Sequence, residues 1–309
     1  MAESKSKVLI IGATGYIGAY LVRASIKLGH PSFILVRSPT PSDPAKAHLI
    51  KSFQDSGVTV LKGDVDDHES LVAALRQVDV VISSVNAGAV ASQVKILEAA
   101  KETGTIKRFI PSEFGNDVDR LENDFKILEG VYQTKRSVRR EIEKSGIPYT
   151  LVISGGFAGY FAPNLASSNV SAPPRDKVTI WADGTTKAIL NTEEDIATYT
   201  IKSVDDPRAA NKNLHIRPEE NVLSQGELVG LWEKKIGHTL EKILVSGEEL
   251  KKIIDETPFP ANILYAILYS VFIKGDQTSF QLNGKDVEAT ELYPDVHYTT
   301  VSTYLDQFV

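Results

Sequence analysis

Short apolar runs alternate with helical patterns through the first half of the chain, and this alternation limits the possible folds more than any other feature. Six runs are predicted to be buried strands: Val8–Gly12, Phe33–Arg37, Val58–Asp64, Val78–Val85, Arg108–Gly115 and Tyr149–Ser154. Strands that are apolar on both faces are typical of parallel sheets covered by helices on both sides. The pattern therefore predicts an α/β fold with a doubly wound parallel sheet.

The alternation ends after Ser154, where a segment rich in glycine and aromatic residues precedes a Ser/Pro-rich stretch. We predict a domain boundary there, with a smaller α/β substrate domain over residues 155–309. That part contains a predicted turn-linked strand pair around residues 181–190 and predicted helices over residues 226–237 and 247–257. Some of its segments could return to the main sheet.

Three glycines, Gly12, Gly15 and Gly18, directly follow the first predicted strand and open the first predicted helix. Gly12 permits a tight turn, Gly15 lets the backbone approach a pyrophosphate, and Gly18 lets the helix pack closely on the sheet. Free N–H groups at the helix start attract the anion. A purely structural turn is the alternative, but the strand-turn-helix context favours a Rossmann dinucleotide-binding domain over residues 1–154. We expect cofactor contacts from the whole loop: Gly12, Ala13, Thr14, Gly15, Tyr16, Ile17 and Gly18.

The second predicted strand ends in Arg37, where a protein that binds NAD would usually have Asp or Glu for the ribose hydroxyl. A cation at this position suits a 2′-phosphate, and Lys46 could supply a second charge to the same group. These residues favour NADP(H) over NAD(H). The alternative is that both are solvated surface charges, as long cationic side chains usually are.

The composition argues against several other functions. The chain has no Cys, which excludes disulfides, thiolate nucleophiles and zinc fingers. Its 34 Lys and Arg residues against 40 Asp and Glu give a net charge of −6, so we expect no nucleic-acid partner. The 6 His residues show no ligand spacing, so we expect no metal site. The longest apolar stretch, Ile263–Ile273, is too short to cross a membrane and no leader pattern precedes the first strand, so we expect a cytoplasmic protein.

Segments spread over nearly the whole chain match one known family in letter and spacing: VLIIGATGYIG, GHPSFILVRS, QVDVVISSV, IKRFIPSEFGNDVDR, KRSVRREIEKSGIPYT, FAGYF, PPRDKV, LWEKKIG, KGDQTSF and ELYPDVHYTTV. The sequence resembles the plant isoflavone-reductase-like family of atypical short-chain reductases. Within it, the chain is most similar to the phenylcoumaran benzylic ether reductases. The resemblance implies an NADPH-dependent reductase acting on a small aromatic phenylpropanoid, with Lys135 as general base, and a homodimer is plausible. It also implies that Arg139 contacts the cofactor and that Phe114 packs against the nicotinamide.

The residues around Lys135 are compatible with this role. Lys135 and Arg139 are four residues apart in a helical pattern, so they share one face near the predicted carboxyl edge of the sheet. The cationic neighbours Arg136, Arg139 and Arg140 and partial burial would disfavour a protonated lysine. Tyr132 lies three residues before Lys135, whereas typical short-chain dehydrogenases place the tyrosine four residues before. This spacing favours a lysine that takes a proton from a substrate hydroxyl.

Several positions differ from what the resemblance leads us to expect. Gly155 and Gly156 stand where relatives have larger side chains, which predicts an enlarged or loosened pocket. Tyr269 replaces a histidine common in the family. We expect the substrate pocket to include Gly155, Gly156, Phe157, Tyr160, Tyr265 and Tyr269.

These differences leave the substrate open. The first interpretation is reduction of an aromatic benzylic ether through a quinone methide. The second is reduction of a pinoresinol or lariciresinol furan ring, an isoflavone or a propenyl-phenol ester of the eugenol type. A third, from another class, is a protein that senses NADP(H) without catalysis. Stereochemistry of hydride transfer and oligomeric state are not determined by the sequence.

Overall fold

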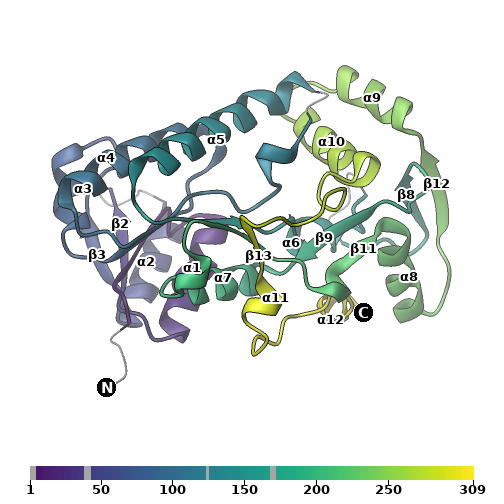
Figure 1. The fold of residues 1–309 in the computed structure, drawn as a ribbon. Coiled ribbons are helices and arrows are strands. Elements are labelled where there is room, and N and C mark those ends of the chain that lie inside the picture. Colours follow the sequence, from purple (N-terminus) through teal and green to yellow (C-terminus); the bar gives the residue numbers. More distant parts are fainter. Residues whose placement is uncertain (1–4, 38–42, 123–124, 168–171) are drawn as a thin grey trace.

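The centre of the protein is a parallel sheet of five strands in the order β3-β2-β1-β4-β5. The computed structural model describes residues 5–37, 43–122, 125–167 and 172–309. The strands are β1 (Val8–Ile11), β2 (Ser32–Val36), β3 (Thr59–Lys62), β4 (Val80–Ser83) and β5 (Arg108–Ile110). The predicted doubly wound α/β sheet is therefore confirmed (Figure 1).

Three further parallel strands continue beside β5. An isolated bridge between Phe109 and Tyr149 joins β5 to β6 (Thr150–Ile153), which pairs with β10 (Lys212–His215), and β10 pairs with β13 (Asp286–Glu288). Segments from beyond Ser154 thus lie beside the strands of the first half, as the sequence allowed. The division into residues 1–154 and 155–309 stays a prediction.

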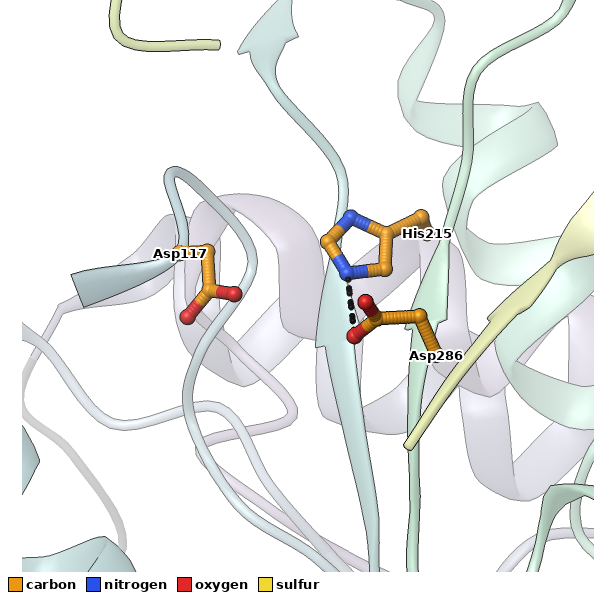
Figure 2. A group of neighbouring side chains, drawn as sticks. All are labelled: Asp117, His215 and Asp286. Atoms are coloured by element: carbon orange, nitrogen blue, oxygen red, sulfur yellow. Dashed lines mark hydrogen bonds and ion pairs between the residues drawn. The ribbon is translucent and has the colours of Figure 1, made fainter. Parts of the chain in front are cut away.

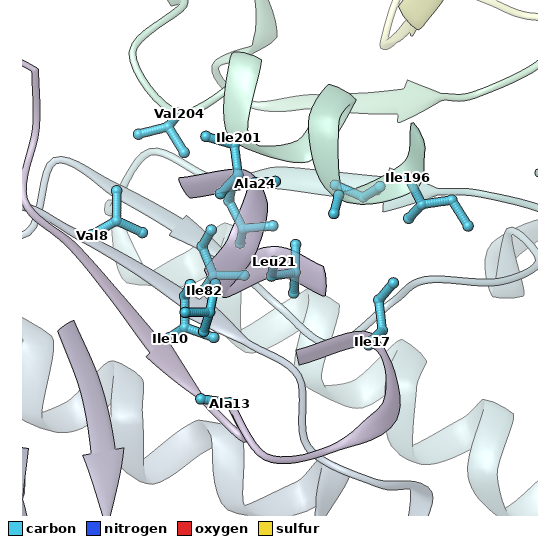
Figure 3. Close-up of a cluster of buried hydrophobic side chains, with 14 of the residues drawn as sticks. Val8, Ile10, Ala13, Ile17, Leu21, Ala24, Ile82, Ile196, Ile201 and Val204 are labelled. Carbon is cyan, nitrogen blue, oxygen red and sulfur yellow. The ribbon is translucent and has the colours of Figure 1, made fainter. Parts of the chain in front are cut away.

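Helices cover both faces of the sheet because successive residues of each strand point to opposite sides. Val8 and Ile10 of β1 belong to one apolar cluster with side chains of α1 (Tyr16–Lys27) and α7 (Glu193–Lys202) (Figure 3). The same cluster includes side chains of α2 (Pro44–Asp55). Leu9 and Ile11 belong to the cluster on the other face, with α3 (His68–Leu75), α4 (Gln93–Thr103) and α5 (Lys126–Ser145). The long helix α5 runs along this second face (Figure 1).

A separate apolar cluster supports the remainder of the chain, with Trp181 and Trp232 among its largest buried side chains. Its strands form two small sheets: β8 (Lys177–Trp181) with β12 (Glu241–Val245), and β7 (Gly156–Phe157) and β11 (Val222–Ser224) on either side of β9 (Lys187–Asn191). Its main helices are α8 (Gln225–Ile236), α9 (Gly247–Glu256) and α10 (Asn262–Tyr269), and the shorter ones are α6 (Ala158–Phe161) and α12 (Val301–Leu305). The short helix α11 (Ala289–Leu292) belongs to the first cluster instead.

The predicted strand pair around residues 181–190 is wrong in its pairing. Both strands exist, but β8 bonds to β12 and β9 bonds to β7 and β11, so the two do not pair with each other. The connecting turn has left-handed backbone at Ala182 and Gly184, with φ of 51° and 71°. Since the N–H of Ala182 donates to the carbonyl of Val245 on β12, the chain stays attached to that strand until the turn begins.

The apolar stretch Ile263–Ile273 forms most of α10 and a following π-helical segment, η5 (Ser270–Lys274). Its residues Leu268, Val271 and Phe272 are buried in the second apolar core. Within the ranges that the structure describes, no helix combines the length and the hydrophobicity needed to span a lipid bilayer.

Candidate active site

Lys135 lies half-buried on α5, near the point where the chain leaves β5. Its Nζ atom donates a hydrogen bond of 2.7 Å to the backbone carbonyl of Glu113. Burial lowers the pKa of the Lys135 amine; the negative charge of Glu113 opposes this shift, and the positive charge of Arg139 adds to it. A lysine with a lowered pKa holds a larger neutral fraction near pH 7 and can act as a base. The expected influence of Arg136 and Arg140 on this amine is not found among the causes of the shift.

Tyr132 lies one helical turn before Lys135 and is also half-buried. Burial, and then the negative charge of Asp276, raises the pKa of the Tyr132 hydroxyl to about 12. The phenol therefore stays protonated at neutral pH and is poorly suited to give up its proton. The role of Lys135, rather than a tyrosine, in the acid-base chemistry stays a prediction.

The loop after β5 presents the Glu113 carbonyl to Lys135 through an unusual turn. The N–H of Glu113 bonds back to the carbonyl of Pro111 at 2.9 Å, and Phe114 has a φ of 37°. The Phe114 N–H donates to Val152 on β6 at 3.0 Å, and the Ser112 hydroxyl donates to the carbonyl of Val85 at 2.8 Å. The loop is therefore fixed to both neighbouring strand ends. Phe114 is buried here, and its contact with a nicotinamide stays a prediction.

Arg139 is fully buried behind this loop, and the cofactor contact that the family resemblance implies for it stays a prediction. Its side chain is 0% exposed, and its guanidinium forms two bonds to Glu113, of 2.9 and 3.0 Å, and one of 2.6 Å to Asp117. All of these contacts are with carboxylates of the protein. The physical reason is that buried carboxylates on the loop after β5 need a buried cation.

The glycine loop has the geometry that the sequence predicted. Gly12 has a φ of 86°, and a Cβ atom there would lie 2.6 Å from the carbonyl oxygen of Ser84 at the end of β4. A Cβ atom on Gly18 would lie 2.1 Å from the carbonyl oxygen of Gly12. Gly15 immediately precedes α1 and no side chain caps that helix, so its first N–H groups remain available to an anion. The loop therefore offers a cradle, open at the backbone, that fits a pyrophosphate.

The two predicted phosphate-binding cations differ in their surroundings. Arg37 directly follows β2 and is exposed, and its side chain has no ion-pair partner among the residues that the structure describes. Lys46 lies in the first turn of α2, half-exposed, with its Nζ 3.9 Å from the carboxylate of Asp43. Because Asp43 already pairs with Lys46, Arg37 is the stronger candidate for a 2′-phosphate. Residues 38–42, between them, lie outside the described part of the chain.

A Cβ atom on Gly155 or Gly156 would meet neighbouring residues closely, and the enlarged or loosened pocket expected there stays a prediction. A Cβ atom on Gly155 would lie 2.8 Å from Ile189, and Gly155 has a left-handed φ of 66°. A Cβ atom on Gly156 would lie 3.0 Å from both Leu190 and Phe161. Side chains of β9 and α6 fill the space that larger residues would take, so these glycines allow close packing of β9.

Phe157 and Tyr160 pack against the glycine loop, a contact that the sequence did not reveal. Tyr16 stacks on Tyr160 with ring centroids 4.7 Å apart and on Phe157 with centroids 5.9 Å apart. The Tyr16 hydroxyl donates to Glu193 at 2.7 Å, and the same carboxylate oxygen accepts from the N–H of Gly159. Tyr16 of the predicted cofactor loop thus forms one aromatic cluster with Phe157 and Tyr160 of the predicted substrate pocket.

The two tyrosines of α10 are placed differently. Tyr265 is half-buried, whereas Tyr269 is 7% exposed and packs edge-on against Phe125 at a centroid distance of 5.1 Å. Tyr269 therefore belongs to the second apolar core, and this packing accounts for its side chain without a substrate. The role of Tyr265 stays a prediction.

A buried polar cluster of Asp117, His215 and Asp286 comes from three distant segments (Figure 2). Their potential ligand atoms lie within 4.8 Å of one another, which is a spacing that the positions of His in the sequence did not reveal. Both carboxylates already form ion pairs: Asp117 with Arg120 at 3.0 Å and with Arg139, and Asp286 with Arg120. Two guanidinium groups oppose a further cation, so the arrangement is an ion-pair network. The expectation of no metal site stays a prediction.

A Rossmann sheet, a backbone cradle for a pyrophosphate and a base-like lysine at the carboxyl edge define a dinucleotide-dependent oxidoreductase. The model of the NmrA-like family matches residues 4–305, and the chain belongs to this family. It is 56% identical over 305 residues to a phenylcoumaran benzylic ether reductase from Ginkgo biloba, with 99% of both chains covered. It is 57% identical over 309 residues to a eugenol synthase from Petunia hybrida, with 100% of both covered.

A solved structure extends the likeness to a cofactor complex. The complex of leucoanthocyanidin reductase with NADPH from Vitis vinifera superposes with a TM-score of 0.90 at 38% identity, covering 98% of this chain and 99% of that one. The crystal structure of an isoflavone reductase superposes with a TM-score of 0.95 at 48% identity, covering 99% of this chain and 100% of that one, which confirms the resemblance to isoflavone-reductase-like enzymes. The predicted cofactor, NADP(H), is supported by this neighbour and by the glycine cradle.

Proposed function

We propose that this protein is an NADPH-dependent reductase that opens the benzylic ether of a phenylcoumaran-type phenylpropanoid. The observation that carries the proposal is the Lys135 amine, which is partly withdrawn from water and held by a backbone carbonyl at 2.7 Å. The full-length likeness to a benzylic ether reductase supports the choice of substrate. We further propose that the protein is a homodimer, which light scattering of the purified chain would test. We also propose that it acts in the cytoplasm, which a fluorescent fusion would test.

In the proposed reaction, Lys135 removes the proton of a phenolic hydroxyl on the substrate ring. The electron pair passes through the ring and expels the benzylic oxygen, so the carbon–oxygen bond breaks and a quinone methide forms. NADPH, when bound, supplies the hydride that adds to the benzylic carbon. The ring regains aromaticity as a phenolate and takes a proton back from Lys135, while the expelled phenoxide takes its proton from water. The protein holds ring and base in line.

The glycine cradle and Arg37 are the parts of the chain that would hold the cofactor. The N–H groups at the start of α1, which has no side-chain cap, would hold the pyrophosphate, and the close approaches of Gly12 to Ser84 and of Gly18 to Gly12 keep the loop in this shape. The exposed Arg37 would hold the 2′-phosphate.

The test is NADPH oxidation with a panel of purified substrates: a dehydrodiconiferyl-type ether, pinoresinol, an isoflavone and a propenyl-phenol ester. We expect turnover on the ether, with the opened phenol as product. Turnover on another member of the panel alone would overturn the substrate assignment. NADPH binding without turnover on any of them would favour the sensor alternative.

A propenyl-phenol synthase is the second candidate, because the eugenol synthase is as similar as the benzylic ether reductase. The same base chemistry serves both reactions, since the side chain can expel the carboxylate of an ester as it can expel the phenoxide of an ether. The panel separates the two, because only the synthase would release a carboxylate from the ester.

Replacing Arg37 with alanine should weaken NADPH binding about tenfold, since a charge-assisted bond to phosphate is worth roughly 1.5–3 kcal/mol and solvent exposure places this one at the low end. The affinity for NADH should not change, because NADH has no 2′-phosphate. Fluorescence titration of both nucleotides measures the ratio, and Lys46→Ala serves as the comparison with a smaller expected effect. Equal losses for both nucleotides would contradict this role for Arg37.

A further inference from the structure

We propose that Arg139 is a positioning residue for Lys135 and acts through Glu113, an inference that rests on the proposed role of Lys135 as the base. Glu113 contacts both residues at once. Its carboxylate accepts two bonds from the guanidinium of Arg139, and its backbone carbonyl accepts the bond from Nζ of Lys135. Arg139 therefore fixes the group that orients the lysine.

The backbone at Glu113 needs such a fixed point. The turn from Pro111 to Phe114 includes a tight bond between the Glu113 N–H and the Pro111 carbonyl and ends in left-handed backbone at Phe114. Backbone of this kind costs free energy and persists only where its surroundings hold it in place. Arg139 holds this backbone in place from the helix that carries Lys135. Its side chain is 0% exposed and pairs both with Glu113 and with Asp117, which lies farther along the loop.

The arrangement also controls the charges near the amine. Glu113 acts on Lys135 from the loop after β5, and Arg139 acts on it from α5. Asp117 and Asp119, on the same loop, face Arg139, and Asp276 acts on the neighbouring Tyr132. Loss of the Glu113 charge should therefore lower the pKa of Lys135, whereas loss of the Arg139 charge should raise it.

The experiment compares Glu113→Gln, Arg139→Gln and the control Arg140→Gln in the full chain. Arg140 lies on the same helix, is half-exposed and pairs with Asp119. A base must be neutral to act, so kcat rises as pH passes the pKa of Lys135. We expect this rise of kcat with pH to occur at lower pH in Glu113→Gln and at higher pH in Arg139→Gln. The maximal kcat should fall about tenfold in both variants, because the lysine is less well held. Arg140→Gln should change neither the pH at which kcat rises nor the maximal kcat.

A second readout needs no substrate. Competitive labelling with acetic anhydride across pH, followed by mass spectrometry of the peptide that contains Lys135, reports the titration of that amine directly. The labelling curve of Lys135 should move to lower pH in Glu113→Gln and to higher pH in Arg139→Gln, as the pH dependence of kcat does. If they do so while no panel substrate turns over, the positioning role stands and the proposed function fails.

The inference is overturned if both variants lose only thermal stability and keep the kcat and titration of Lys135. Arg139→Gln leaves the buried carboxylates of Glu113 and Asp117 with one partner fewer, so Arg139→Lys takes its place if it does not fold. The lysine keeps the charge and loses the two-pronged contact with Glu113. Its expected signature is a lower kcat with the titration of Lys135 little changed, and an unaltered kcat would count against the proposal.

Discussion

Replacing Lys135 with alanine should lower turnover by about 10²-fold or more, the loss expected when a positioned base is removed. The substrate hydroxyl then has no group to take its proton, and the ring cannot expel the benzylic oxygen. NADPH binding should persist, because the cradle at Gly12 and Gly18 lies on β1 and α1 whereas Lys135 lies on α5. Single-turnover kinetics together with an NADPH titration by fluorescence measures both quantities on the same protein.

Lys144→Ala is the matched control for this variant. Lys144 lies on the same helix and its side chain is 69% exposed, so its loss should leave turnover unchanged. Activity of the unaltered protein should also extend to a lower pH than an ordinary lysine would permit, since burial lowers the pKa of Lys135. Full turnover in Lys135→Ala would rule out the base, and with it the proposed reaction.

Replacing Gly18 with alanine should weaken NADPH binding by about 10- to 100-fold. The added methyl group would lie 2.1 Å from the Gly12 carbonyl oxygen and 2.8 Å from the Ser84 hydroxyl, so the loop must move. Overpacking of this kind costs roughly 1–3 kcal/mol, and each 1.4 kcal/mol corresponds to about tenfold in affinity. Calorimetric titration with NADPH gives the affinity, and a thermal melt gives the accompanying loss of stability.

Gly230→Ala gives the comparison, because Gly230 is also a helical glycine, on α8, but a Cβ atom there meets nothing within 4 Å. This variant should be more stable by about 0.5–1 kcal/mol, since alanine favours helix over glycine, and NADPH affinity should not change. A Gly18→Ala protein that binds NADPH as tightly as the parent would show that the cradle is not the pyrophosphate site.

Local patterns predicted the strands and the glycine loop because their causes lie within a few residues of one another. Val8 and its neighbours are apolar on both faces, which only a covered strand needs, and Gly12 and Gly18 follow at the spacing of a phosphate loop. Lys135 was singled out through the family resemblance, since residue type alone favours a solvated lysine.

Contacts between distant segments could not be predicted in the same way. Arg139 lies on the same helical face as Lys135, but only the fold reveals that Glu113 and Asp117 surround it. Likewise, nothing in the sequence around Gly155 shows that Ile189 occupies the space beside it. The partner of each of these residues is set by tertiary packing between segments that lie far apart in the chain, and local sequence patterns do not predict such contacts.

The position of β13 beside β10 has a consequence for biosynthesis. A nascent chain that has not yet extended beyond Asp286–Glu288 leaves β10 with an unpaired row of backbone N–H and carbonyl groups. Such an open edge can recruit a strand from another polypeptide. A chain shortened before Asp286 would therefore present this edge of β10 and should aggregate more readily than the full chain, which light scattering of the two proteins would measure.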